Sequence, residues 1–223
     1  MRISIITLFP EMFIAVLNSS ILKRAQTKEK VAFDLINLRE FGEGRHQIVD
    51  DKPYGGGAGM VFKADILAKA LKSIPKGKVI LMSASGTTYK QAKVRELSKL
   101  KHLILICGHY EGVDQRFIDK YVDEEISIGD YVLTGGEIPA MIIADSVVRL
   151  LPGVLEKPEA TINESFTENL LEGPQYTRPE EFEGEKVPEV LLSGNHAEIA
   201  KWHKEKSIEK TEKTRPDLFI QKD

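Results

Sequence analysis

The chain has 223 residues, and 31 basic side chains against 34 acidic ones give a formal net charge of −3. A hydrophobic content of 42% and a charged content of 29% are ordinary for globular proteins, so they exclude wholesale disorder. The single cysteine, Cys107, excludes an intrachain disulfide, and no stretch has the length and apolar character of a membrane-spanning helix or a signal peptide. We therefore expect a soluble, cytoplasmic protein of one to two domains.

Strand and helix patterns alternate through the first two thirds of the chain. Strands are predicted over Arg2–Thr7, Ala32–Leu38, Lys78–Met82, His102–Cys107 and Val122–Ser127. Helices are predicted from Pro10 to about Lys28 and over Lys63–Ser73, Tyr89–Leu100, Asp114–Lys120 and Gly136–Leu151. Because the strands are apolar throughout, this alternation is typical of a parallel α/β sheet covered on both faces.

The remainder of the chain differs in composition. Residues 156–190 contain three basic and ten acidic side chains, several prolines and little periodicity, which is typical of a linker. A Lys- and Glu-rich helix is predicted over Asn195–Thr214. We predict an α/β domain over 1–155, a linker over 156–179 and a small helical domain over 180–223.

Positive charge gathers in one part of the α/β domain. Lys63–Lys101 contains ten basic side chains, and only Asp65 and Glu96 are acidic. This segment could face nucleic-acid phosphates, or it could form two amphipathic helices with lysine-rich solvent faces.

Three glycine-containing loops follow predicted strands: Ser83–Gly86, Gly108–Gly112 and Ile128–Glu137. In open α/β sheets ligands bind at the carboxyl ends of the strands, and glycine lets the backbone approach a ligand closely. Tyr110 and Tyr131 could stack on a flat ring. Together the loops predict a pocket for a heterocyclic ligand.

Other chemistry has weaker support. The run Pro53–Met60 matches neither a phosphate-binding loop nor a dinucleotide fingerprint, and it is interpreted as an RNA-contacting or pocket-covering loop, or as a solvated hairpin. The five histidines are scattered and no metal-ligand spacing occurs, so no metal site is assigned. Cys107 ends an apolar strand, where a buried, inert thiol is expected.

Four strings carry a resemblance: PYGGGAGM, CGHYEGVD, SIGDYVLTGGE and LLSGNHAEI. In combination they closely resemble the bacterial tRNA (guanine-N(1)-)-methyltransferase family of the SPOUT superfamily. The resemblance implies an α/β domain with a C-terminal trefoil knot, a homodimer, and S-adenosylmethionine bound by the knot loops. Carried over residue by residue, it implies cofactor contacts at Met82, Ser83, Gly108, Tyr110, Glu111, Ile128, Gly129, Asp130, Tyr131, Val132, Leu133, Gly135, Gly136 and Pro139.

The implied substrate is tRNA with guanosine at position 37, preceded by another guanosine, and the implied product is 1-methylguanosine. Removing the proton from ring nitrogen 1 calls for a carboxylate base, and the charge that develops on the exocyclic oxygen calls for a cation or amide donors. The family places the base as aspartate in a D-S-F triplet, whereas this chain has Glu164-Ser165-Phe166. Glu164 is therefore the candidate base, and the supporting arginine falls on Arg149.

The resemblance also implies that the C-terminal helices grip tRNA, with His196, Lys201, Trp202, Lys204 and Lys206 as candidate contacts. Magnesium dependence is a family property, but no ligand cluster can be assigned to the ion. Two alternatives stay open. One is a tRNA-binding homologue without activity, and the other is a 2′-O-ribose methyltransferase of the same superfamily.

Overall fold

The computed structural model describes residues 1–157, 161 and 164–219. The chain divides into two compact units, Met1–Glu156 and Lys157–Asp223, each of which is described by itself. The finer division of the second unit into a linker and a helical domain stays a prediction.

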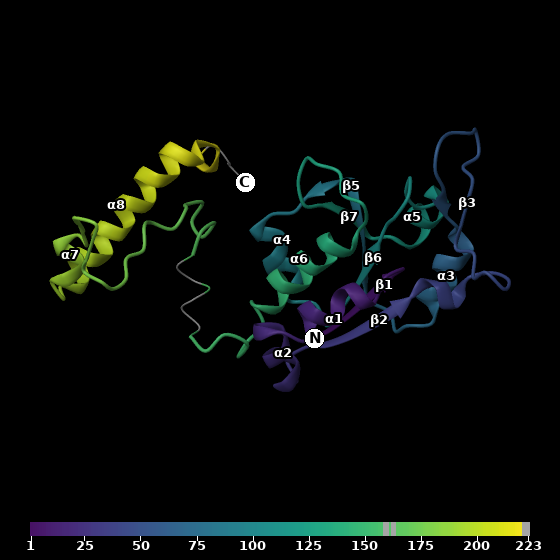
Figure 1. Ribbon diagram of the computed structural model, residues 1–223, viewed down its shortest axis with the longest axis horizontal. Coiled ribbons are helices and arrows are strands. Elements are labelled where there is room, and N and C mark those ends of the chain that lie inside the picture. Colours follow the sequence, from purple (N-terminus) through teal and green to yellow (C-terminus); the bar gives the residue numbers. More distant parts are fainter. Residues whose placement is uncertain (158–160, 162–163, 220–223) are drawn as a thin grey trace. The chain divides into compact units, whose positions relative to one another are not determined.

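The N-terminal unit is built on one five-stranded sheet, seen with its helices in Figure 1. The strand order is β2-β1-β6-β5-β7, and every pair is parallel. The strands are β1 (Arg2–Thr7), β2 (Ala32–Asn37), β5 (Lys78–Thr88), β6 (His102–Cys107) and β7 (Glu124–Ser127). This confirms the predicted parallel α/β sheet.

Alternate residues of the central strands are buried on opposite faces of the sheet. In β6, Leu103, Leu105 and Cys107 join one apolar cluster, whereas Ile104 and Ile106 join another. The first cluster includes side chains of α1 (Glu11–Leu17), α2 (Ser20–Thr27), α4 (Gln91–Leu97) and α6 (Glu137–Val148). The second includes side chains of the 3-10 helix η1 (Leu38–Phe41), α3 (Ala64–Lys72) and α5 (Gln115–Tyr121). Helices therefore cover both faces, as the apolar strands predict.

Several predicted elements differ in extent from the observed ones. The single helix expected from Pro10 to Lys28 is two helices, because Ser19 adopts an extended conformation (φ −118°, ψ 153°). The strand expected to end at Met82 continues to Thr88, with a register shift against β7 between Met82 and Thr87. The following helix, α4, is shorter at both ends than the predicted Tyr89–Leu100.

The loop between η1 and α3 contains a short antiparallel hairpin of β3 (Asp50–Asp51) and β4 (Val61–Phe62). Val49 and Phe62 at its base are fully buried, whereas Tyr54 near its tip is 99% exposed. The polar, glycine-rich composition of Gly42–Met60 predicts that this loop lies outside the core, and that prediction is wrong for Val49.

The C-terminal unit is organised around α8 (His196–Thr214), whose N-terminus is capped by the Asn195 side chain. The backbone N–H of Leu171 donates to Thr211 Oγ1 over 2.9 Å, and Lys210 Nζ donates to the Glu172 carbonyl over 2.9 Å, so the acidic segment is bound along the helix. The remaining elements are β8 (Glu181–Phe182), β9 (Glu185–Lys186), α7 (Glu189–Leu192) and the 3-10 helix η3 (Pro216–Phe219). The hairpin of β8 and β9 is too short to give a periodic pattern, and the sequence does not predict it.

An ion pair joins the first two strands and predicts a pH effect on stability. Arg2 and the Ser4 hydroxyl on β1 both donate to the Asp34 carboxylate on β2. The hydrogen bond from Arg2 is the main cause that holds the pKa of Asp34 below its ordinary value; partial burial opposes it, and Ser4 reinforces it. Because the folded pKa is depressed, the stabilisation is complete above the unfolded pKa of about 4 and is lost as pH falls through the folded value.

We expect Asp34→Asn to lower the free energy of unfolding by about 1 kcal/mol near neutral pH, since the pair is partly exposed. Urea unfolding of both proteins, repeated in acid below the folded pKa, should show the difference shrinking. A difference that stays constant with pH would contradict an ionic contribution.

Candidate active site

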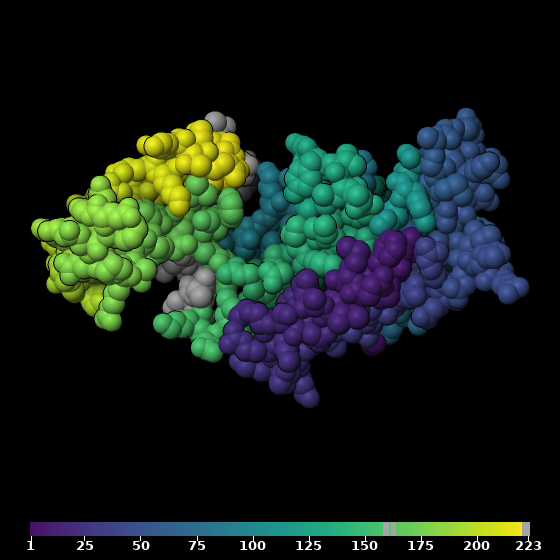
Figure 2. Space-filling view, in the orientation of Figure 1, coloured from purple at the N-terminus to yellow at the C-terminus, as the bar shows by residue number. Residues whose placement is uncertain are grey.

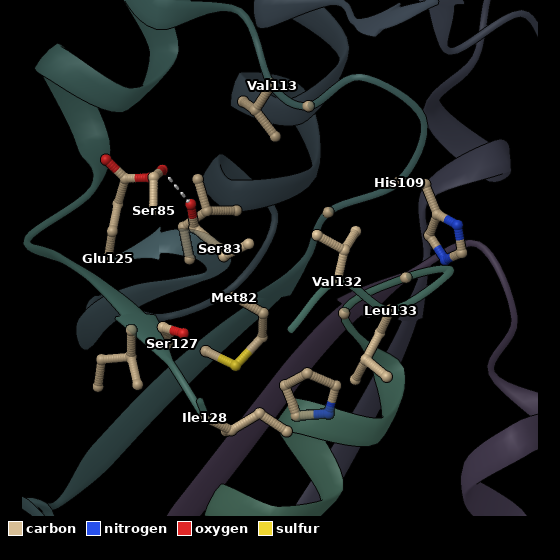
Figure 3. A pocket seen from close by; sticks show the side chains of 18 of the residues that line it. Met82, Ser83, Ser85, His109, Val113, Glu125, Ser127, Ile128, Val132 and Leu133 are labelled. Atoms are coloured by element: carbon tan, nitrogen blue, oxygen red, sulfur yellow. Dashed lines mark hydrogen bonds between the residues drawn. The ribbon is translucent and has the colours of Figure 1, made fainter. Parts of the chain in front are cut away.

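A pocket of about 530 Å³ lies at the carboxyl ends of β5, β6 and β7. The volume is within the range of small-molecule sites. Figure 3 shows Met82 of β5 together with Ile128 and Leu133 of the Ile128–Glu137 loop around one part of it. Ser83 and Ser85, which follow the buried part of β5, are joined by a 2.9 Å hydrogen bond on another side. Residues of all three glycine-containing segments singled out in the sequence line this pocket, although Ser83–Gly86, predicted as a loop, lies within β5.

The structure brings thirteen of the fourteen predicted cofactor residues to this pocket. They are Met82, Ser83, Gly108, Tyr110, Glu111, Ile128, Gly129, Tyr131, Val132, Leu133, Gly135, Gly136 and Pro139. Asp130 does not line the pocket and is exposed, although both of its neighbours do line it.

At two glycines, the main chain of one segment packs directly against the main chain of another. A Cβ added at Gly136 would lie 2.7 Å from the Cys107 Cα and from the Gly108 nitrogen, and the Gly136 N–H donates to the Gly108 carbonyl over 2.9 Å. A Cβ added at Gly86 would lie 2.5 Å from the Glu125 carbonyl carbon. At both positions only glycine permits the observed packing.

The hairpin loop is bonded to the pocket through its backbone. The Glu111 N–H donates to the Met60 carbonyl over 3.0 Å, and the Phe62 N–H donates to the Gly112 carbonyl over 2.9 Å. Gly59 (φ +82°) packs against the Glu111 side chain so closely that a Cβ would lie 2.4 Å from Oε1. The glycine run PYGGGAGM thus adjoins a pocket-lining residue.

Beneath the pocket, Glu137 is the first residue of α6 and is 2% exposed. Thr7 Oγ1 donates to Glu137 Oε1 over 2.6 Å, and His109 Nε2 lies 2.6 Å from Glu137 Oε2. Burial, reinforced by Glu137, raises the pKa of Cys107 well above its ordinary value. The burial of Cys107 is as expected from its place at the end of an apolar strand.

Sequence reasoning missed several lining residues, among them His109, Gln115, Ile118, Glu125, Ser127 and Thr134. His109 and Thr134 lie inside the predicted loops, and Glu125 and Ser127 lie at the carboxyl end of β7, where a ligand site is expected. Gln115 and Ile118 are on α5, and no local pattern marks them.

The residues that line the pocket suit a positively charged nucleoside as the ligand. Gly108, Gly129 and Gly135 allow close backbone approach, and Met82, Leu133 and Pro139 supply apolar contacts. Glu111 and Glu125 add carboxylates, which favour a positively charged ligand. Tyr110, held at φ +59°, and Tyr131 are half-exposed at the rim, where each could cover a planar ring.

The two predicted catalytic residues lie in different units. Arg149 caps the C-terminus of α6 and is half-buried; its N–H donates to the Asp145 carbonyl over 3.1 Å. Glu164 opens a tight turn, in which the Thr167 N–H donates to the Glu164 carbonyl over 3.1 Å.

The Glu164 turn lines a second cavity, of about 560 Å³, within the C-terminal unit. Its wall on α8 includes His196, His203 and Lys204, and Lys204 Nζ bonds to Glu168 over 2.6 Å. Two of the candidate tRNA contacts, His196 and Lys204, therefore share one groove with the candidate base.

Within the described ranges, no cluster of three side chains of metal-ligating type occurs. Nor does the described part of the chain contain a helix with the length and hydropathy to cross a membrane.

Comparison with known proteins gives one consistent result. The family model described as "tRNA (Guanine-1)-methyltransferase TrmD" matches residues 1–221. The chain is similar to the tRNA (guanine-N(1)-)-methyltransferases of Bacillus velezensis (56% identity, covering 98% of this chain and 92% of the relative) and of Bacillus subtilis (53%, 98% and 92%). It is also similar to that of Dictyoglomus turgidum (55%, 98% and 90%).

Proposed function

The chain belongs to the tRNA (guanine-1)-methyltransferase family and methylates ring nitrogen 1 of guanine in tRNA, and from that premise we propose that its acceptor is guanosine 37, preceded by another guanosine. The observation that carries the site assignment is the pocket at the carboxyl ends of β5, β6 and β7, where three glycine loops meet. Family membership implies S-adenosylmethionine as the methyl donor, and we assign it to this pocket.

When bound, S-adenosylmethionine supplies an electrophilic methyl group on a sulfonium. The pocket walls would hold the nucleoside part against the close main chain at Gly108 and Gly135, and Glu111 and Glu125 would favour the cation. Fixing the donor in this way lowers the entropic cost of aligning methyl group and acceptor, which accounts for much of the acceleration in such transfers.

The acceptor needs activation because ring nitrogen 1 of guanine bears a proton. We assign proton removal to the Glu164 carboxylate, one methylene longer than the aspartate usual in the family. Arg149 would stabilise the negative charge that grows on the exocyclic oxygen as the proton leaves. The turn from Glu164 to Leu170 supports the assignment of Glu164, because its backbone hydrogen bonds fix the main chain from which the carboxylate extends.

We further propose the trefoil knot and the homodimer of the family. The close approach of Gly136, at the start of α6, to the end of β6 supports a knot, because it packs two chain segments that are separated in sequence directly against each other. α1 and α6 pack against each other, and both carry exposed apolar side chains, Met12 and Ile14 on one and Ile138 and Ile142 on the other. Figure 2 shows the purple surface of the N-terminal helices bordering the green surface of the α6 region, and we assign this apolar face to the dimer.

The C-terminal unit supports a role in tRNA binding. On α8, Trp202 packs with Tyr176 and His203 at ring-centroid distances of 6.1 and 5.1 Å, beside exposed lysines such as Lys201. Aromatic rings next to lysine side chains are suited to unpaired bases and phosphates. We propose a cytoplasmic location, where tRNA is modified. For the magnesium ion that the family resemblance implies, we assign no ligands in this chain.

The function is tested by transfer of a labelled methyl group from S-adenosylmethionine to tRNA transcripts. Transcripts with guanosine or adenosine at position 37, and with guanosine or adenosine at position 36, form matched pairs. We expect label only where position 37 is guanosine, with a lower rate when position 36 is changed, and 1-methylguanosine after digestion to nucleosides.

Each other outcome points to a different function. Label recovered on a ribose oxygen would indicate a 2′-O-ribose methyltransferase. Binding of both cofactor and tRNA without transfer would indicate a homologue without activity. Label that enters the adenosine-37 transcript equally would place the acceptor elsewhere in the tRNA.

A further inference from the structure

The buried carboxylate of Glu137 has no part in the mechanism above, although it is among the few charged groups enclosed in the described core. It does not itself line the pocket, but Gly136 before it and Pro139 after it do. Removing a carboxylate from water is costly unless hydrogen bonds compensate. Two hydrogen bonds of 2.6 Å and a place in the first turn of the twelve-residue α6 provide that compensation.

The positions of the hydrogens between Glu137, Thr7 and His109 follow from which groups can donate and which can accept. Thr7 Oγ1 already accepts the Phe9 N–H over 3.0 Å, so its own hydrogen is directed to Glu137. With Glu137 ionised, its carboxylate only accepts, and the 2.6 Å contact then assigns a hydrogen to His109 Nε2. Glu137 therefore fixes both the orientation of the imidazole and which ring nitrogen is protonated.

His109 in turn contacts the loops on two sides. A Cβ at Gly135 would lie 2.2 Å from His109 Cε1, so the ring packs tightly against the Ile128–Glu137 loop. Figure 3 shows the ring beside this loop, which carries Val132 and Leu133. Edge-to-face contacts join the ring to Phe9 at 5.1 Å and to Tyr110 at 6.2 Å between centroids. The chain neighbours of His109 on both sides, Gly108 and Tyr110, line the pocket.

We propose that Glu137 is a positioning residue for methyl transfer: by holding His109 through Nε2–H and Thr7 through its hydroxyl, it sets the spacing of the Gly108–Gly112 and Ile128–Gly136 loops that the cofactor requires. The proposal rests on the assignment of S-adenosylmethionine to this pocket. A hydrophobic residue of similar size could fill the same space without the cost of burying a charge, so packing alone does not account for a carboxylate here.

Substitutions at position 109 separate hydrogen bonding from packing. His109→Gln keeps an N–H donor near Nε2 but loses the ring, whereas His109→Phe keeps the ring contacts but loses the donor. If Glu137 acts through the hydrogen bond, His109→Phe weakens S-adenosylmethionine binding about tenfold or more, and His109→Gln retains most of the affinity. The opposite order, measured by calorimetric titration, would overturn the proposal.

Glu137→Gln tests the same contact from the other side. The new amide oxygen can accept from Thr7, so its NH₂ group faces His109 and requires an unprotonated Nε2. Nitrogen-15 NMR of the cofactor-free protein should then show the hydrogen of His109 moved to Nδ1, with cofactor affinity about tenfold weaker. Glu124→Gln, which removes a carboxylate that pairs with Lys93 outside the pocket, is the matched control and should change neither signal nor affinity.

Thermal unfolding of every variant separates loss of fold from loss of positioning. A Glu137→Gln protein that folds, shows the moved hydrogen and binds S-adenosylmethionine as tightly as wild type would refute the proposal. Failure of the wild-type protein to bind S-adenosylmethionine would instead refute the pocket assignment on which it rests.

Discussion

Glu164→Gln is expected to lower the turnover number for guanosine methylation about 10³-fold, because loss of a general base typically costs 10²–10⁴-fold. Glutamine has the shape of glutamate but cannot accept the proton from ring nitrogen 1. Cofactor affinity should not change, because Glu164 is not among the residues that line the cofactor pocket. Single-turnover transfer and calorimetric titration measure the two quantities separately.

Glu168→Gln is the matched control for this prediction. Glu168 lies in the same turn and pairs with Lys204, so its loss tests whether any acid of the turn suffices. We expect wild-type turnover from it. Glu164→Asp should give an intermediate rate, since it keeps a carboxylate but withdraws it by about one carbon–carbon bond. Transfer that survives Glu164→Gln would place the base elsewhere, with the Asp50–Asp51 loop as the next candidate.

Gly136→Ala is expected to weaken S-adenosylmethionine binding about 100-fold, because displacement of aligned groups by about 1 Å can cost that factor in an active site. The added methyl group would lie 2.7 Å from main-chain atoms of Cys107 and Gly108, which no side-chain rotation can relieve. The two pocket loops must therefore separate, and the hydrogen bond from Gly136 to Gly108 is lost. The free energy of unfolding should also fall by about 1–3 kcal/mol, as in other overpacked sites.

Gly44→Ala provides the control for stability. Gly44 has φ +67° and open space where a Cβ would lie, so alanine there costs about 1–2 kcal/mol of backbone strain without touching the pocket. If Gly44→Ala unfolds more easily yet binds cofactor normally, weaker binding by Gly136→Ala cannot be attributed to stability. Normal cofactor binding by Gly136→Ala would contradict the packing described for the two loops.

Much of the pocket could be predicted from the sequence because parallel strands end at a common edge. The predicted bounds of β1 and β6 are confirmed, since both strands are short apolar runs between polar residues. Because β6, β5 and β7 are successive parallel neighbours, the segments that follow them lie at the same end of the sheet. The convergence follows from local patterns and the geometry of the sheet.

What could not be predicted depends on contacts distant in sequence or on competing local hydrogen bonds. Asn18 and Ser19 side chains bond to the carbonyls of Ile14 and Ala15, which ends α1 although the apolar spacing continues. Residues after Met82 are polar and become strand only because β7 pairs with them in a shifted register. In the sequence Glu137 is only the last acid of a glycine loop, and its burial requires Thr7 and His109 from two other strand ends.

The order of strands in the sheet also determines when the chain can fold during its synthesis. β1 pairs with β2 soon after both have been made, but its other neighbour is β6, and 98 residues separate Ser4 from His102 across that pairing. At about 5–20 residues per second, a ribosome takes roughly 5–20 s to make that length. Until then the edge of β1 that pairs with β6 has no strand beside it. We therefore expect the β1–β6 pairing, and with it the centre of the sheet, to form only after β6 has been synthesised.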